Sequence, residues 1–279
     1  MNKVKITLII LGLLLLQIKP AAAFDLGGYM GPLKFKFTDF SDGATAPFLV
    51  PGYGHADTVE DAFGIFKVST INADDFASTL LWFDGKNGEE LTGMYYNIDD
   101  DLRDLVGFGG LNIQSVGGQL DIYLDSTPDF NAALGPAGRT GTSTFPTVTD
   151  GTPFLNLVMV PGVKYGDFIP ANDYIVYNND FNGTTTPFSG GGLFFADVTG
   201  GSWSSTFDSN AICMTDDSGV NHCTDFLGQF DTTTVGAGPW LVKSEDPVSG
   251  TAIPEPATMF LLGSGLVGMI GTRLRKQKV

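Results

Sequence analysis

The stretch LKFKFTDF, residues 33–40, decides the fold class of this chain. Its side chains alternate, so that Leu33, Phe35 and Phe37 fall on one face of an extended backbone and two lysines on the other. A period of two residues is typical of a β-strand with one buried side and one solvent-facing side. We therefore predict a half-buried strand here, with a charged outer face.

Short apolar runs of this kind recur along the chain, separated by glycine, proline and other turn-forming residues, and no long helical period is visible. This pattern is typical of an all-β sandwich or barrel. We predict an all-β fold, an antiparallel β-sandwich, with a jelly roll as its candidate topology. The further predicted strands are AFGIFKVSTI (62–71), LLWFDG (80–85), TGMYYNID (92–99), FLNLVMV (154–160), DYIVYN (173–178), GGLFFADVTG (191–200), FLGQFDTT (226–233) and PWLVKS (239–244).

Three segments give more specific expectations. LNIQSVGGQLDIYLD, residues 111–125, predicts a hairpin that turns at Gly117-Gly118, because two glycines supply the positive φ angles of a tight turn. DDDLRDLV, residues 99–106, predicts a helical turn with acidic residues near its N-terminus. Residues 130–153 are rich in Gly, Thr and Pro, which predicts a long surface loop or a boundary between two smaller β units.

The N-terminus has the features of a secretory signal peptide. Two early lysines, an apolar run at 6–16 and the small residues Ala21 and Ala23 follow one another in the order that export requires. The apolar run is shorter than the roughly 20 residues that a membrane-spanning helix needs, which favours cleavage over anchoring. We predict that residues 1–23 are removed and that the mature chain begins at Phe24.

The chain between the two ends is strongly acidic. Residues 24–253 contain eight lysines and arginines against thirty aspartates and glutamates, a formal net charge of −22. A surface of this charge repels nucleic-acid phosphates and anionic lipids, so we expect neither as a partner. It attracts cations such as Ca²⁺, although the solubility of an exported protein explains it more simply.

The two cysteines, Cys213 and Cys223, both lie in this exported body. Oxidising conditions outside the cytoplasm favour a disulfide, and the short loop between them predicts a stabilisation of about 3 kcal/mol. The polar sequence between the cysteines suits a hairpin end or a surface loop. A metal site with His222 is the alternative, but it would need further ligands.

Calcium is the one cofactor for which the sequence offers candidate ligands. In NNDFNG, Asn178, Asp180 and Asn182 place oxygen atoms at alternate positions before a glycine, as in the opening half of a Ca²⁺ loop. The twelfth position is Ser189, where such a loop carries a bidentate glutamate. Asn and Asp are also common turn residues, which is the simpler explanation of the pattern.

No catalytic residues are predicted. The body has few histidines and lacks a Gly-x-Ser-x-Gly elbow, a His-Glu-x-x-His pair and a phosphate-binding loop. We therefore expect a protein that is not an enzyme. A glycosidase that uses two aspartates stays as an alternative, since nothing in the spacing selects a pair.

Large aromatic residues offer another candidate site. Trp82, Tyr95, Tyr96, Trp203 and Trp240 could form a sugar-stacking platform on one face of the sandwich. Most large aromatic residues of a β domain belong to its core, and the strand alternation does not decide between these two roles.

The C-terminus ends in an unusual tail. Pro254, Glu255 and Pro256 precede a sixteen-residue apolar run at 257–272, and an arginine- and lysine-rich cluster follows it. As a helix this run would extend about 24 Å, less than the ~30 Å hydrocarbon core of a bilayer. We predict a short membrane helix whose basic end stays cytoplasmic.

The order of these parts resembles the PEP-CTERM sorting signal of Gram-negative bacteria. The Pro-Glu-Pro triplet, the adjacent Ala-Thr, the core LLGSGL and the basic end TRLRK all match it, over about the last 26 residues. The resemblance implies recognition and cleavage by an exosortase, a membrane cysteine transpeptidase. It also implies export to the cell surface or into extracellular polymer, often in species that form biofilms or flocs.

These observations combine into one expectation. We predict a signal peptide (1–23), a β-sandwich body (24–242), a linker (243–253) and a sorting signal (254–279). The tail would hold the chain briefly in the inner membrane before release to the cell surface or extracellular matrix. There we expect a non-enzymatic structural or adhesive protein, with extracellular polysaccharide as a candidate partner. The alternatives are a Ca²⁺-assisted carbohydrate-binding module and, behind it, a polysaccharide hydrolase.

Overall fold

The structure of the protein is a computed structural model that describes residues 24–43, 60–106, 110–161, 176–181, 189–215 and 221–253. The described part is almost entirely β-structure. Its strands are β1 (Gly31–Gly43), β2 (Ala62–Ala73), β3 (Leu80–Phe83), β4 (Glu90–Val106), β5 (Gly110–Asp125), β6 (Thr152–Val160), β7 (Val176–Phe181), β8 (Ser189–Gly200), β9 (Ile212–Thr215), β10 (Asn221–Thr224), β11 (Phe226–Thr233) and β12 (Val242–Ala252). The helical pieces are short: α2 (Ser204–Phe207) and the 3₁₀ turns Lys86–Gly88, Ala132–Leu134 and Pro136–Gly138.

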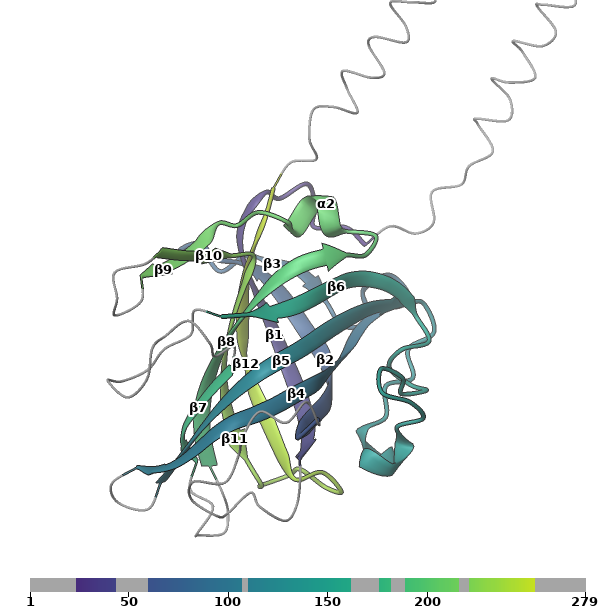
Figure 1. Ribbon diagram of the computed structural model, residues 1–279. Coiled ribbons are helices and arrows are strands. Elements are labelled where there is room, and N and C mark those ends of the chain that lie inside the picture. The colour runs from purple at the N-terminus through teal and green to yellow at the C-terminus, as the bar shows by residue number, and fades with distance from the viewer. Residues whose placement is uncertain are drawn as a thin grey trace, which may run out of the picture.

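The strands close into a barrel, as Figure 1 shows. Eight of the described strands follow the order β1-β12-β11-β8-β6-β5-β4-β2, and β2 pairs again with β1, with every pairing antiparallel. Apart from the inserted β3, β7 and β9–β10, each strand neighbours the next one along the chain, as in an up-and-down barrel. The all-β, antiparallel prediction is confirmed, but the predicted sandwich is a closed barrel. Closure depends on pairing the first strand with the last, which local periodicity does not encode.

Strand β1 follows the predicted alternation. Leu33 and Phe35 are buried inside the barrel and Phe37 is half-buried, while Lys36 is exposed on the outer surface. Burying one such apolar side chain contributes about 1.5–3 kcal/mol, which fixes the face that this strand turns inward.

Two predictions for the β4–β5 region are wrong. Residues 99–106 continue β4 as a strand instead of forming a helical turn, and 111–125 lie within the single strand β5. Gly117 and Gly118 do have positive φ angles of 72° and 90°, but they lie within β5, which pairs with β4 in the same register on both sides of them, and the chain does not reverse there. Glycine adopts a positive φ at little steric cost inside a strand as well as in a turn, so two adjacent glycines do not by themselves predict a chain reversal.

The predicted linker at 243–253 is instead most of β12, the strand that closes the barrel against β1. Its polar composition, which suggested a tether, is compatible with a strand because hydrogen bonds to two neighbouring strands hold it. Pro247 lies where β12 has no paired residue on β11, between the pairs Thr232–Ser244 and Gly228–Val248. A proline, which lacks an N–H donor, is tolerated at such a gap.

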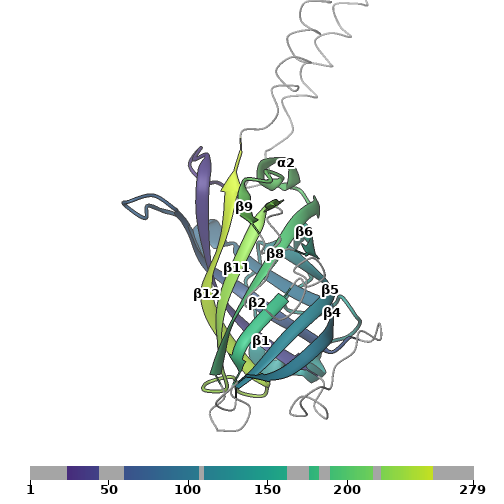
Figure 2. The same ribbon diagram turned by 60° about the vertical axis from the view of Figure 1, so that its left-hand side comes forward.

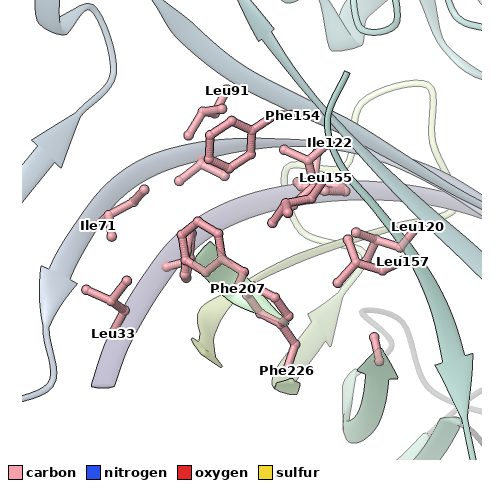
Figure 3. Packing of buried hydrophobic residues seen from close by; sticks show 14 of the residues in the cluster. Leu33, Ile71, Leu91, Leu120, Ile122, Phe154, Leu155, Leu157, Phe207 and Phe226 are labelled. Carbon is pink, nitrogen blue, oxygen red and sulfur yellow. The ribbon is translucent and has the colours of Figure 1, made fainter. Parts of the chain in front are cut away.

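The upper end of the barrel, where β1 begins, is filled with large apolar side chains. Figure 3 shows part of this core, with Leu33, Ile71 and Phe207 among the side chains that meet inside the barrel. The helical turn α2 covers this end. Phe24 packs beneath it, with ring centroids 4.7 Å from Phe154 and 4.9 Å from Trp203.

A second apolar cluster lies outside the barrel. The connection between β5 and β6, residues 126–151, folds over the outer surface and buries Phe145 and Val148 against Ile65 and Met94. Hydrogen bonds hold it there, from the Thr92 hydroxyl to the Val148 carbonyl at 2.7 Å and from the Trp240 indole N–H to the Ala132 carbonyl at 2.7 Å. The stretch predicted as a loop or a domain boundary therefore connects neighbouring strands of one barrel.

Strands β1 and β12 place the two ends of the described body together. Gly31 pairs with Ala252 beside α2, at the upper end in Figures 1 and 2. The N–H of Ile253 then donates to the Thr206 carbonyl at 2.8 Å. None of the helices in the described ranges has the length and apolar character needed to cross a membrane. The predicted signal peptide and tail helix lie outside the described residues.

Candidate functional site

A cavity of about 170 Å³ occupies the lower half of the barrel, the half away from α2. All eight strands of the closed barrel contribute to its lining. It extends to the end where β1 stops at Gly43 and β2 begins at Ala62. Phe37, Phe66 and Phe194 separate it from a smaller void of about 40 Å³ higher in the barrel.

Four aromatic side chains of the cavity lining each pack against a glycine on the neighbouring strand. The glycine is the residue paired directly with the aromatic one, and a Cβ atom added to that glycine would fall inside the van der Waals surface of the aromatic side chain. An aromatic side chain can therefore lie flat along the wall instead of crossing the lumen, an arrangement known from engineered sheets. The pairs are Phe66 with Gly93, Tyr95 with Gly64, Phe194 with Gly228 and Phe230 with Gly192.

A buried polar pair interrupts the apolar lining. The Tyr95 hydroxyl donates a hydrogen bond to Asp39 Oδ2 at 2.9 Å, and Asp39 is only 5% exposed. Burial raises the pKa of Tyr95 well above its ordinary value, and the charge of the Asp39 carboxylate raises it further. Tyr95 therefore stays protonated at neutral pH and remains a hydrogen-bond donor to the carboxylate.

The other polar groups of the cavity are small. They are Ser41, Ser115, Thr232 and Ser244, together with a second carboxylate, Asp42. Among the described residues, the lining contains no lysine, arginine or histidine. The cavity thus combines apolar walls with negative charge, and a few convergent polar groups in a concave apolar site are the usual signature of small-molecule binding.

A second group of titratable residues lies on the outer surface, where carboxylate oxygens of Glu90, Asp125 and Asp129 all fall within 4.8 Å of one another. Such oxygens could contact a divalent cation. Glu90, however, already faces the Lys67 ammonium at 3.0 Å and accepts hydrogen bonds from the N–H groups of Asp129 and Phe130, at 2.7 and 3.0 Å. These contacts give the cluster a visible structural role in attaching residues 126–151 to the barrel.

The pKa values of Asp129 and of the neighbouring Lys67 are both raised in this cluster, for different reasons. Burial, followed by the charges of Asp150, Glu90 and Asp125, raises the pKa of Asp129 above its usual 3.8. Burial acts to lower the pKa of Lys67, but its contacts with Asp84 and Glu90 outweigh burial and leave that pKa above its usual value. The lysine therefore remains a cation that holds two carboxylates together.

The structure does not test the residues predicted to bind Ca²⁺, because it does not describe their side chains. Asn178 and Asp180 lie in strand β7, whose backbone pairs with β5 and β8, and Asn182 lies outside the described residues. The Ca²⁺ assignment stays a prediction. Ala21, Ala23, Pro254, Glu255 and Pro256 also lie outside the described residues.

The predicted disulfide is confirmed. Cys213 and Cys223 are joined, and they lie directly opposite each other in the β9–β10 hairpin. This hairpin forms its own two-stranded sheet, separate from the barrel. The bond therefore closes a hairpin end, as the polar sequence between the cysteines indicated.

The aromatic residues considered for a sugar-stacking platform do not form one. Trp82, Tyr96 and Trp240 are at least nine-tenths buried, and Trp203 packs on Phe154 in the upper core. Tyr96 and Trp240 belong to the outer cluster, whereas Trp82 lies in the barrel core. These side chains therefore pack in the interior and are not displayed on the surface, as is usual for large aromatic residues.

The sequence did carry one overlooked signal of the cavity. Asp39 stands in the opening stretch LKFKFTDF on the same face as Leu33, Phe35 and Phe37, so the alternation places a carboxylate on an apolar face. A charged residue at an inward position is rare unless it is paired, and this marks it as a candidate site residue. The glycine–aromatic pairs offered no such signal, because they require the strand register.

Comparison with known proteins identifies one segment of the chain. No curated protein and no solved structure matches the chain as a whole. Residues 252–276 match the family model of the PEP-CTERM protein-sorting motif, which covers the tail recognised above and begins at the last residue of β12. The motif indicates an exported protein of a Gram-negative bacterium that is processed by an exosortase. The chain therefore carries a PEP-CTERM protein-sorting motif directly after a closed β-structured body.

Proposed function

We propose that this protein is a non-enzymatic component of the cell surface or extracellular matrix, delivered there when an exosortase processes its C-terminus. The observation that carries the proposal is the sorting motif at 252–276. The body contributes an acidic surface, which favours solubility and disfavours association with anionic membranes. A structural role fits better than carbohydrate stacking, because the large aromatics are buried.

The place of the motif in the fold supports a defined orientation. Only Ile253 separates the end of β12 from the Pro-Glu-Pro triplet, so the attachment point lies beside α2 at the upper end of the barrel. The cavity lies at the opposite end. A chain held through its C-terminus would therefore present the cavity end away from the attachment point.

The proposal is tested by replacing Pro254-Glu255-Pro256 with three alanines in the full chain. We expect the variant to be exported but to stay unprocessed in the membrane fraction, because the exosortase loses its recognition triplet. Mass spectrometry of the C-terminus and fractionation of cells and matrix report both effects. Substituting three exposed residues of the barrel surface provides the control, and equal processing and localisation of triplet variant and wild type would refute the proposal.

A further inference from the structure

The lower cavity has the dimensions of a site for one small molecule. Its volume of about 170 Å³ is close to the ~150 Å³ of an engineered apolar cavity that binds benzene. It therefore has room for a body of about one aromatic ring. It reaches the end of the barrel beside Gly43 and Ala62, and the opposite end is filled by the upper core.

The space results from the choice of side chains along the strands. In the upper half, inward positions carry residues such as Leu33, Phe35 and Phe226, whereas the lower half carries Ser115 and Ser244 at buried positions. The aromatic rings of the lower half lie on glycines and line the wall. The cavity is therefore specified at several strands, unlike a void left by one misfitting side chain.

The walls favour an apolar ligand with a flat or compact body. The rings of Phe66, Phe194 and Phe230 each lie against a glycine, and all three residues line the cavity. Aromatic faces carry partial negative charge and attract cations as well as apolar groups. Met159 and Leu120 complete this apolar surface.

The charge of the cavity selects the sign of the ligand. Asp39 and Asp42 line it, and no basic side chain does so among the described residues. A carboxylate has about four acceptor positions, so Asp39 can hold the Tyr95 hydroxyl and still accept from a ligand donor. The same carboxylates repel an anion, which excludes fatty acids and other carboxylates as preferred ligands.

We propose that the lower lumen of the barrel binds a small monoamine, with its apolar body of about one ring among Phe66, Phe194 and Phe230 and its ammonium group on Asp39. The hydrogen bond from Tyr95 positions the carboxylate for this contact. The inference goes beyond the proposed function, because sorting and surface localisation do not depend on an occupied cavity.

The experiment is a calorimetric titration of the purified exported protein with three ring-sized probes that differ in their polar group. Benzylamine is expected to bind, benzyl alcohol to bind about tenfold more weakly, and benzoate not to bind measurably. An ammonium adds a charge-assisted hydrogen bond that the alcohol lacks, and tenfold corresponds to about 1.4 kcal/mol. Equal binding of all three probes, or no binding of benzylamine at millimolar concentration, would overturn the proposal.

Two variants locate the binding in the cavity. Asp39→Asn keeps the shape of the side chain and should weaken benzylamine about tenfold while leaving benzyl alcohol nearly unchanged. Asp208→Asn removes the same charge from an exposed position beside α2 and should change neither affinity. If both variants weaken benzylamine equally, the effect is one of overall charge and the proposed site is wrong.

A third variant covers the case in which Asp39→Asn fails to fold. Ala62→Leu enlarges an apolar side chain in the cavity lining without removing a polar group. It should weaken benzylamine and benzyl alcohol together, because it occupies space that both need. Unchanged affinity for both probes in a folded Ala62→Leu protein would place the binding elsewhere.

Discussion

Single buried polar residues connect the parts of this molecule. Glu90 is 1% exposed, and it joins the barrel to the connection at 126–151 through backbone N–H groups at 2.7 and 3.0 Å. Lys67 supplies the positive charge that makes its burial tolerable, and Asp84 shares the same ammonium at 2.8 Å. Asp39 plays a comparable part within the lumen, where Tyr95 donates to it. In both places a carboxylate is buried where a donor has been positioned for it.

The acidic cluster around Asp129 predicts a pH-dependent stability. Because its folded pKa lies above the usual 3.8, the folded protein holds this proton more tightly than the unfolded chain does. The free energy of unfolding therefore falls as pH rises from below the unfolded pKa through the folded one, and stays lower above it. Asp129→Asn removes this penalty.

We expect Asp129→Asn to raise the melting temperature by about 1–2 °C at pH 7, where the carboxylate is charged, and to have no effect at pH 3. Thermal unfolding followed by circular dichroism at both pH values measures this. Asp208→Asn is the control for the loss of one negative charge. A lower melting temperature of Asp129→Asn at pH 7 would show that its charge is stabilising, contrary to the prediction.

At the scale of elements, cross-strand pairs of an aromatic residue and a glycine shape the barrel wall. The pairing of Phe194 with Gly228 shows the principle, because the three atoms nearest to a Cβ atom on Gly228 would all belong to the Phe194 ring. The ring would then have to turn into the lumen. Register alone creates these pairs, since the two partners come from strands far apart in the sequence.

Gly228→Ala is therefore expected to lower the free energy of unfolding by about 1–3 kcal/mol, the usual cost of overpacking. Chemical denaturation measures this value. Adding Phe194→Ala to Gly228→Ala should cost less than the sum of the two single changes, because the clash disappears with the ring. Gly200→Ala, whose added Cβ would meet only an ordinary contact with Asn156, is the control and should have little effect. Additive effects of the first two changes would contradict the pairing.

At the scale of the whole molecule, β12 decides whether the barrel exists. It pairs with β1 along nearly its whole length and with β11 at both of its ends. Without it, β1 and β11 would become open edges, and the buried side chains of β1 would lose one wall. The strand that the sequence suggested as a tether is thus the element that closes the fold.

Truncation separates the strand from the sorting tail. A mature chain that ends at Ile253 should unfold cooperatively at the same temperature as one that includes residues 254–279, because the described barrel ends at Ala252. A chain that ends at Val242 should not fold, since it lacks the closing strand. Size-exclusion chromatography and circular dichroism distinguish the two, and a folded chain ending at Val242 would show that β12 is dispensable.

The sequence by itself determined the features that depend on local patterns. Alternation in LKFKFTDF specified an antiparallel β fold with Leu33 and Phe35 inside, because side chains of a strand alternate between faces. The spacing of Cys213 and Cys223 specified their disulfide, and the ordered parts of the tail specified the sorting motif, because each is read from neighbouring residues.

Only the tertiary structure decided the features that depend on which strands meet. Closure into a barrel, the role of residues 243–252 as a strand and the pairing of Phe66 with Gly93 all require contacts between distant segments. The cavity also depends on contacts between segments that are distant in the sequence. Its lining comes from eight strands, and the sequence shows only that Asp39 lies on an apolar face. Local periodicity sets which face of each strand is buried, whereas the register between strands sets what that face encloses.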